Sequence, residues 1–308
     1  MLKFAPPVKP NIHSANLSHM IYPYFFVNGN ILHQDKALIP IYDLGLLRGM
    51  GIFDFFRVLD GVAVFAEDHI ERLQNSIRNL GMEVDYSPID WADKFNELIK
   101  ANKADRAGFR VVVTGGFSED GYSIPEQKNI YMMLHELPPN DPIQFEHGVS
   151  LITSDYRRDL PSVKTTIYVR SMQLQPKMKQ EGAFEVLYHW NGEITECSRC
   201  NIFFIDQEGK LITPASGMLH GVTRKKILAI AKEQQIPVVE RTVTLSEMPQ
   251  MAGAFLTATT KGVWPVVKID QQVIGSGHVH PLCIQLSDLF DEKLKQYISS
   301  ARLAQMVL

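Results

Sequence analysis

The chain has 308 residues, of which 45% are hydrophobic and 21% charged, and its formal net charge is −3. These ordinary globular values exclude a disordered or fibrous class and favour one large domain or, better for this length, two modest ones. The composition has no basic excess, so no nucleic-acid or membrane-surface partner is expected, and no apolar run is long enough to span a membrane. The three cysteines fit a reducing, cytoplasmic compartment better than a disulfide framework.

The first part of the chain predicts strands joined by tight turns, followed by helices. Residues 1–21 are expected to be a loose extension, because prolines interrupt them and no long apolar stretch follows Lys3 as in a signal peptide. Helical spacing of apolar residues over 70–80 predicts a helix that stops at Gly81, and Ser87-Pro88 predicts the start of another. Strands are expected at 24–27, 53–59, 62–65, 109–114 and 129–135, with hairpin turns at Asn28-Gly29 and Asp60-Gly61.

A proline-rich stretch at 137–142 predicts a boundary between two domains. Beyond it, helices are expected after Gly221 and after Pro281. Strands are expected at 149–153, 184–190, 201–205 and 255–259, with a hairpin turn at Asn191-Gly192. Strands mixed with helices predict an α+β fold of two domains with a cleft between them. The expected organisation is an extension at 1–21, a small α/β domain at 22–137, a linker at 138–145 and a larger domain at 146–308.

Lys164 is the first candidate catalytic residue. It lies beside Val163 and two threonines, where its side chain could point into a cavity. A desolvated lysine has a lowered pKa and can attack an aldehyde carbon. A surface lysine remains the alternative, because lysine is usually exposed.

Other segments offer groups for a phosphorylated aromatic cofactor. Glu196 precedes an apolar strand, where a carboxylate could keep a pyridine nitrogen protonated, although a solvated turn glutamate is the alternative. Gly221-Val-Thr223 opens a predicted helix whose amides and hydroxyl could bind an anion, or merely cap the helix. Residues 257–260 supply further hydroxyls, and Arg72 could hold a phosphate with two hydrogen bonds. An ordinary strand end and an exposed helix arginine are the respective alternatives.

None of these features is specific alone, but their order along the chain resembles that of the class IV aminotransferases. That family includes branched-chain aminotransferases, D-amino acid aminotransferases and 4-amino-4-deoxychorismate lyases. The resemblance extends over residues 24–289. The matching segments are 27–29, 46–53, 67–73, the segment around Lys164, 195–203, 221–224, and 255–260 together with Pro265-Val266.

The resemblance implies the pyridoxal-phosphate fold type IV, in which a small α/β domain precedes a larger domain with a β-barrel-like core. It implies pyridoxal 5′-phosphate (PLP) as cofactor, with Lys164 as the Schiff-base lysine and proton shuttle and Glu196 beside the pyridine nitrogen. It also implies a homodimer in which loops of one chain complete the site of the other. The remaining positions implied to hold the cofactor are Arg72, Tyr168, Val222, Thr223, Thr259 and Thr260.

The implied function is transfer of an amino group between a D-amino acid or a branched-chain L-amino acid and a 2-oxo acid. The stretch Thr195-Glu-Cys-Ser-Arg-Cys200 is also similar to aminodeoxychorismate lyases, which leaves a lyase as the second hypothesis. A catalytically silent binding protein that keeps the fold is the third. No metal is expected, because a C-x-x-C pair with one further cysteine does not complete a zinc site.

The chain departs from the family pattern where substrate should bind. D-amino acid enzymes carry an Arg-x-His pair where this chain has Asp120-Gly-Tyr122. Arg48 and Arg110 are therefore the candidates for a substrate carboxylate, with a structural ion pair as the alternative for Arg110. Arg199 occupies a position that is usually small or acidic, where it could meet a substrate side-chain carboxylate or cover the cofactor. Asp54, among bulky aromatic residues, is expected to line or support the pocket.

Overall fold

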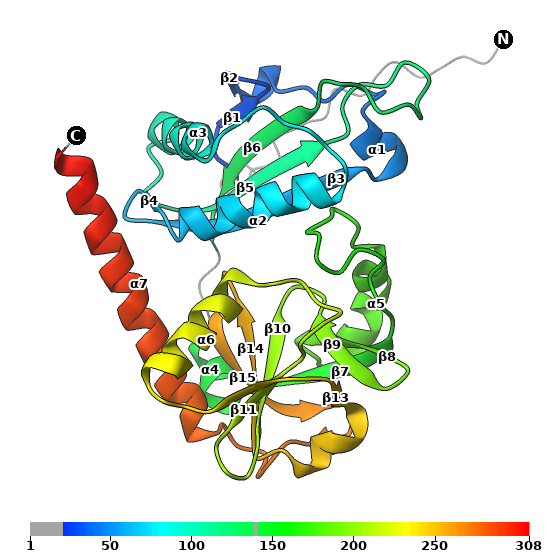
Figure 1. Cartoon of the computed structure of the whole chain (residues 1–308), viewed down its shortest axis with the longest axis vertical. Coiled ribbons are helices and arrows are strands. Elements are labelled where there is room, and N and C mark those ends of the chain that lie inside the picture. Colours follow the sequence, from blue (N-terminus) through cyan, green and yellow to red (C-terminus); the bar gives the residue numbers. More distant parts are fainter. Residues whose placement is uncertain (1–20, 138–140, 308) are drawn as a thin grey trace.

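The computed structural model describes residues 21–137 and 141–307, which form two β-sheets with helices on their outer faces (Figure 1). Most of the predicted extension at 1–21 therefore lies outside the described residues. The first sheet has six strands in the order β2-β1-β6-β5-β3-β4, and all its pairings are antiparallel. Its strands are β1 (Tyr24–Val27), β2 (Asn30–His33), β3 (Gly51–Leu59), β4 (Val62–Ala63), β5 (Arg106–Thr114) and β6 (Asn129–His135).

The first part of the chain also contains helices, and the residues before α2 and α3 show why these two helices begin where they do. The helices of this part are η1 (Gln34–Lys36), α1 (Leu44–Arg48), α2 (Ala66–Asn79) and α3 (Pro88–Ala101). The predicted capping at Ser87 is confirmed, because its side chain accepts from the Asp90 amide and the Asp90 carboxylate accepts from the Ser87 amide. The strand predicted at 62–65 ends early, because Phe65 takes φ 53° and turns the chain into α2.

The second sheet has ten strands, and its central members form a barrel-like ring. The path runs β12-β11-β10-β14-β15-β7-β8-β9-β13, with β16 paired to β15. β9 also contacts β10, and the Cys197 amide donates to the Cys200 carbonyl at 2.8 Å, so the sheet curls back on itself without continuous strand pairing. Its strands are β7 (Val149–Asp155), β8 (Glu185–Trp190), β9 (Glu193–Cys197), β10 (Asn201–Ile205), β11 (Leu211–Thr213), β12 (Val238–Glu240), β13 (Val243–Thr244), β14 (Gly253–Ala258), β15 (Gly262–Ile269) and β16 (Gln272–Val273).

The described helices of the second part include three that the sequence patterns did not indicate, namely α4, α5 and η2. The helices of this part are α4 (Pro142–His147), α5 (Val169–Gln180), α6 (Val222–Glu233), η2 (Leu245–Gln250) and α7 (Pro281–Val307). α4 begins inside the predicted linker, of which residues 138–140 lie outside the described part. α5 contains Pro176 and no buried residue, so apolar periodicity could not reveal it. Among the described residues, no helix has the length and apolar character needed to cross a bilayer.

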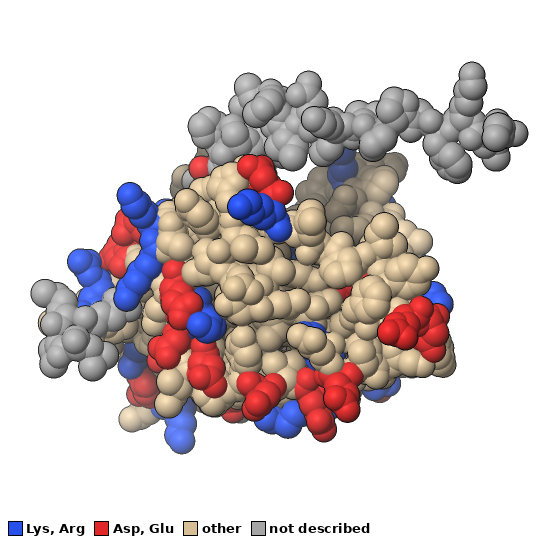
Figure 2. Space-filling view, turned by 90° about the horizontal axis from the view of Figure 1, so that it is seen from above, with Lys and Arg blue, Asp and Glu red and all other residues tan. Residues whose placement is uncertain are grey.

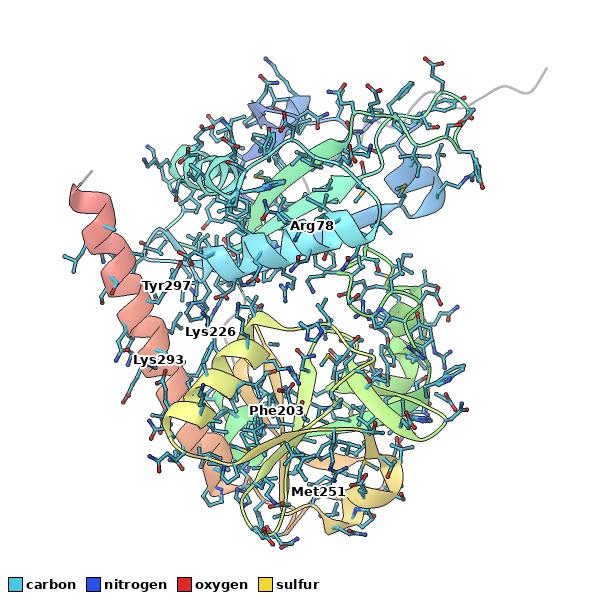
Figure 3. The ribbon with its side chains drawn as sticks, in the orientation of Figure 1. Arg78, Phe203, Lys226, Met251, Lys293 and Tyr297 are labelled. Carbon is cyan, nitrogen blue, oxygen red and sulfur yellow. The ribbon has the colours of Figure 1, made fainter. Side chains whose placement is uncertain are left out.

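The two sheets are joined by contacts from α2 to α6 and α7. Tyr297 of α7 donates from its hydroxyl to Glu67 Oε2 at 2.8 Å, and Lys226 of α6 forms an ion pair with Asp68 of α2 at 2.5 Å. Figure 3 shows Tyr297 and Lys226 in the region where these three helices meet. Phe65, which precedes α2, packs within the same hydrophobic cluster as Phe290. The division into domains at 22–137 and 146–308 remains a proposal, since α7 spans both parts.

Candidate active site

A cavity of about 540 Å³ lies between the two sheets, within the usual size of small-molecule sites. Residues of the first sheet and α2 form one wall, and residues of β8, β9, β10 and the start of α6 form the other. Arg48 does not line the cavity. The predicted residues that do line it are Lys164, Arg72, Tyr168, Glu196, Val222, Thr223, Thr259, Thr260, Arg110 and Arg199.

Lys164 is carried by a loop that follows β7 and is fixed against β3. The Phe53 amide donates to the Lys164 carbonyl at 2.9 Å, and the Lys164 amide donates to Ser76 Oγ of α2 at 3.2 Å. Its Nζ lies 4.5 Å from the centroid of the Phe53 ring. Burial, and then the charge of Arg72, lower the pKa of Lys164 to about 7, against the opposing charge of Asp54. A substantial fraction of this amine is therefore deprotonated, and nucleophilic, at neutral pH.

Glu196 is buried within β9, not in a solvated turn, and is held by Arg158. Arg158 Nε donates to Glu196 Oε1 at 2.7 Å, and the Leu219 amide donates to Oε2 at 3.0 Å. Burial raises the pKa of Glu196, while Arg158 opposes that rise. Arg158 Nη1 also donates to the Val163 carbonyl at 2.9 Å, so one guanidinium ties Glu196 to the loop of Lys164. Arg158 could not be predicted as a site residue from the sequence, because only the fold brings its loop beside β9.

Arg72 is oriented by a buried carboxylate. Its Nε and Nη2 donate to Asp54 Oδ2 and Oδ1 at 2.8 and 2.7 Å, and His69 Nδ1 lies 2.8 Å from the same Oδ1. Asp54 is 1% exposed, and despite burial its pKa is held well below the usual range by Arg72 and His69. Asp54 therefore supports the pocket without lining it, and the outer edge of the Arg72 guanidinium stays available to the cavity.

The start of α6 has the features that an anion site requires. Gly221 is its N-cap residue and provides no side-chain cap, so the first amides, at Val222 and Thr223, remain open toward the cavity. A Cβ at Gly221 would collide with the Asn201 side-chain oxygen, so glycine is required there. Thr257 Oγ1 is buried and has no hydrogen-bond partner in the described part of the chain. An unsatisfied buried hydroxyl at a cavity wall indicates a bound polar group.

Arg110 and Arg199 reach the cavity from opposite sheets. The Arg110 guanidinium carbon lies 4.9 Å from the Phe53 ring centroid and 5.6 Å from that of Phe55. Within residues 21–137 and 141–307 it forms no ion pair, so the alternative role of Arg110 in a structural ion pair is not observed. Arg199 Nε donates to Glu185 Oε2 at 2.9 Å.

Arg48 ends α1 on the surface, next to a large group of exposed apolar side chains. Its Nη1 donates to the Leu47 carbonyl at 3.2 Å. The ring centroids of Tyr42 and Phe117 are 6.0 Å apart, so the segments 38–46 and 117–124 lie side by side. Figure 2, a view from above, shows a broad uncharged surface with mixed charges around it. The exposed apolar residues of the two segments are Leu38, Ile39, Ile41, Tyr42, Leu46, Phe117, Tyr122 and Ile124.

The fold and this site are those of a fold type IV, pyridoxal-phosphate-dependent enzyme. The chain belongs to the class IV aminotransferases, whose family pattern it matches over residues 51–269. It is 28% identical over 261 residues to a D-alanine aminotransferase of Bacillus licheniformis, covering 83% of this chain and 91% of that one. It is 30% identical over 277 residues to a provisionally named branched-chain-amino-acid aminotransferase of Methanocaldococcus jannaschii, covering 87% and 95%.

Solved structures share the fold. The Escherichia coli branched-chain amino acid aminotransferase superposes with a TM-score of 0.82 at 22% identity, covering 89% of this chain and 95% of that one. A Legionella pneumophila protein provisionally named a 4-amino-4-deoxychorismate lyase superposes with a TM-score of 0.77 at 25% identity, covering 84% and 96%. The predicted α+β fold with two parts and a barrel-like core is confirmed.

The residues around the cavity fit pyridoxal 5′-phosphate. The open amides of α6, the unsatisfied hydroxyl of Thr257 and the outer edge of Arg72 suit its phosphate. The carboxylate of Glu196 suits its ring nitrogen, and the amine of Lys164 suits its aldehyde. In the described residues no cluster of three or more His, Cys, Asp or Glu side chains is placed to hold a metal ion.

Proposed function

We propose that this protein binds pyridoxal 5′-phosphate through Lys164 and transfers an amino group between an amino acid and a 2-oxo acid. The observation that carries the proposal is the position of the Lys164 amine. It lies in a cavity whose walls offer an anion site at α6 and a carboxylate at Glu196, and its pKa is lowered to about 7. The substrates we propose are a D-amino acid or a branched-chain L-amino acid with a small 2-oxo acid as acceptor.

The roles of the side chains follow from their positions. The bound cofactor supplies an electron sink for the pair of electrons left when a proton leaves the substrate α-carbon. Lys164 would remove that proton through Nζ and return it to the cofactor carbon that is bonded to the transferred nitrogen. Glu196, fixed by Arg158, keeps a negative charge beside the ring nitrogen. Tyr168, whose ring centroid lies 5.7 Å from that of Phe53, also lines the cavity, and burial raises its pKa, so its hydroxyl stays protonated as a donor.

Arg110 is the proposed partner of the substrate carboxylate on the first-sheet side. Its guanidinium is half-buried over Phe53 and Phe55, and no acid of the described residues neutralises it. Burial lowers the pKa of Arg110, which is the desolvation cost that a bound carboxylate would offset.

The proposal is tested with the purified, cofactor-loaded protein and a panel of D- and L-amino acids. We expect each good donor to shift the visible absorbance of the bound cofactor, and a 2-oxo acid to restore it, because the amino group is held on the protein between the two half-reactions. Bound cofactor that no amino acid of either configuration converts would contradict the proposal and favour the silent binding protein.

A lyase is the second candidate function. It is supported by the likeness at 25% identity to the Legionella protein and by the Cys197–Cys200 stretch that resembles lyases. Such an enzyme would use the same lysine and the same cavity, and would differ in its product. Release of pyruvate and p-aminobenzoate from aminodeoxychorismate, at a rate above that of any amino-group transfer, would establish the lyase.

We further propose a homodimer in which Arg48 enters the site of the other copy. The exposed apolar residues of segments 38–46 and 117–124 form a surface of the kind that protein interfaces bury. If the sites are shared, inactive Lys164→Ala and Arg48→Ala proteins should regain part of their activity when mixed, because each hybrid dimer has one intact site. Native mass spectrometry should show two chains. A monomer, or mixing without recovery, would contradict the shared site.

A further inference from the structure

The guanidinium of Arg110 is contacted by aromatic rings and by no acid of the described residues. Its central carbon lies 4.9 Å from the centroid of the Phe53 ring and 5.6 Å from that of the Phe55 ring. Its nitrogens donate to no acceptor in the part of the chain that the structure describes. The residues that fix these two rings therefore also fix the direction in which Arg110 points.

The strand register places the neighbours of Phe55 on the same face of the first sheet. Arg110 is paired directly with Phe55 across β3 and β5, and Gly108 is paired directly with His135 across β5 and β6. Directly paired residues share a face of a sheet, and so do residues two positions apart on one strand. All four residues therefore lie on one face, and it is the face toward the cavity because Phe55 and Arg110 line that cavity.

His135 packs flat against the Phe55 ring. The two ring centroids are 5.2 Å apart, and the ring planes differ by 15°. Burial, and then the charge of Arg110, lower the pKa of His135, so its imidazole is neutral at neutral pH and does not repel the guanidinium. The Phe55 ring therefore has an aromatic neighbour from β6 as well as the guanidinium from β5.

Gly108 leaves open the space in which the Phe55 ring lies. A Cβ at this position would lie 2.7 Å from Phe55 Cζ, 2.9 Å from Phe55 Cε2 and 3.0 Å from His135 Cε1. Contacts this short would force the ring to move. Glycine inside a strand is unfavourable unless another group approaches the backbone closely, and here that group is the Phe55 ring.

We propose that Gly108 and His135 are positioning residues for substrate recognition, which hold the Phe55 ring where it directs the Arg110 guanidinium into the cavity. An arginine held by rings keeps all its N–H donors for a ligand, whereas an arginine paired with an acid has some of them occupied. Neither Gly108 nor His135 is among the described residues that line the cavity, so each acts through Phe55. This inference rests on the proposed function, in which Arg110 binds the substrate carboxylate.

The test compares two ligands of matched shape, 4-methylpentanoate and its uncharged amide, by calorimetry on the cofactor-loaded protein. Gly108→Ala should weaken carboxylate binding by about 10-fold, because the added methyl group displaces the Phe55 ring and Arg110 with it. The affinity for the amide should stay as in wild type. In turnover, KM for the amino acid should rise with little change in kcat.

Variants of His135 test the same role without adding volume to β5. His135→Ala should weaken carboxylate binding by about 3-fold or more, as expected for the loss of one stacked pair. His135→Phe keeps a flat ring and should restore the affinity. If Gly108→Ala does not fold, these two variants decide the question alone.

A double variant shows whether Gly108 acts through Arg110. In an Arg110→Gln background, Gly108→Ala should cause no further loss, because the group that is positioned has gone. His33→Ala is the matched control, since it removes another imidazole of this sheet that contacts an aromatic ring, that of Tyr24 at a centroid distance of 5.8 Å. It should leave both affinities unchanged. Equal losses for the carboxylate and the amide, or losses that add in the double variant, would overturn the inference.

The outcomes separate this inference from the proposed function. If Arg110→Gln lost carboxylate affinity but Gly108→Ala and His135→Ala kept it, the positioning role would be wrong and the proposed function would stand. If Arg110→Gln itself kept full carboxylate affinity, both the role of Arg110 and its positioning would be wrong. Absence of turnover with every donor would contradict the proposed function, and the two affinities would still decide the role of Gly108 and His135.

Discussion

Replacement of Lys164 by alanine should lower turnover by about a thousandfold or more, because the variant loses both the covalent attachment and the proton carrier. Treatment of the loaded wild-type protein with borohydride should fix the cofactor to the peptide that contains residue 164, as seen by mass spectrometry. The variant should show no such mass increase. Lys261→Ala, which removes a lysine close to the cavity, should keep the mass increase. Attachment at another lysine would contradict the assignment of Lys164.

The pH dependence of loading provides a second measurement on this amine. Only the deprotonated amine attacks, so the loading rate of the apoprotein should rise through a midpoint near the pKa of about 7 and then level off. The stability of the apoprotein should follow the same group. The pKa of Lys164 is lower in the folded state than its ordinary 10.5, so the unfolded state binds more protons between these values. Urea unfolding should therefore show wild-type stability rising relative to Lys164→Met from pH 7 toward pH 10.

Replacement of Asp54 by alanine should lower the free energy of unfolding by about 3–5 kcal/mol, because it leaves Arg72 with no carboxylate in a buried setting. The affinity for the cofactor should fall as well, since Arg72 loses the two hydrogen bonds that orient it. Because the pKa of Asp54 is lowered on folding, its contribution is present above the unfolded pKa and is lost as pH falls through the folded value. Urea unfolding and cofactor titration measure the two effects.

The controls for Asp54 separate charge from shape. Asp54→Asn keeps the volume and one acceptor oxygen, so it should lie between wild type and Asp54→Ala. Asp93→Ala, on the exposed face of α3, should change stability by less than about 0.5 kcal/mol. If Asp54→Ala unfolded within 1 kcal/mol of wild type, the buried ion pair would not contribute as described.

Local chemistry made much of the fold predictable from sequence. The turns Asn28-Gly29, Asp60-Gly61 and Asn191-Gly192 all take positive φ between paired strands, as predicted. α3 begins at the predicted Ser87-Pro88 signal, and α6 begins directly after Gly221, as predicted. α2 begins at Ala66, four residues before the apolar spacing that predicted it, and has no side-chain cap. Short strands such as β12 and β13 escaped prediction, because two or three residues carry no measurable alternation.

Residues of the candidate site could be predicted only where the type of side chain itself indicates a chemical role. Lys164, Glu196 and Arg72 were predicted, and the cavity includes all three. Arg158, Glu185 and Asn201 were not, because their importance depends on strands that meet only in three dimensions. Asp54 was predicted to line or support the pocket, and the buried pair with Arg72 decides for support. Nothing in the sequence shows which side chain will satisfy another when both come from distant segments.

The groups proposed to hold the phosphate come from different parts of the fold, since Arg72 belongs to α2 and the uncapped amides belong to α6. Between these two helices, in the described part of the chain, Lys225 and Lys226 form ion pairs with Asp68, and Lys225 also pairs with Glu71. A tightly bound phosphate that contacts both α2 and α6 would stabilise the contact between the two parts of the molecule. Loss of the cofactor would then weaken the contact between the two parts of the molecule. Resistance to proteases and heat would therefore depend on vitamin B6 supply as well as on the polypeptide.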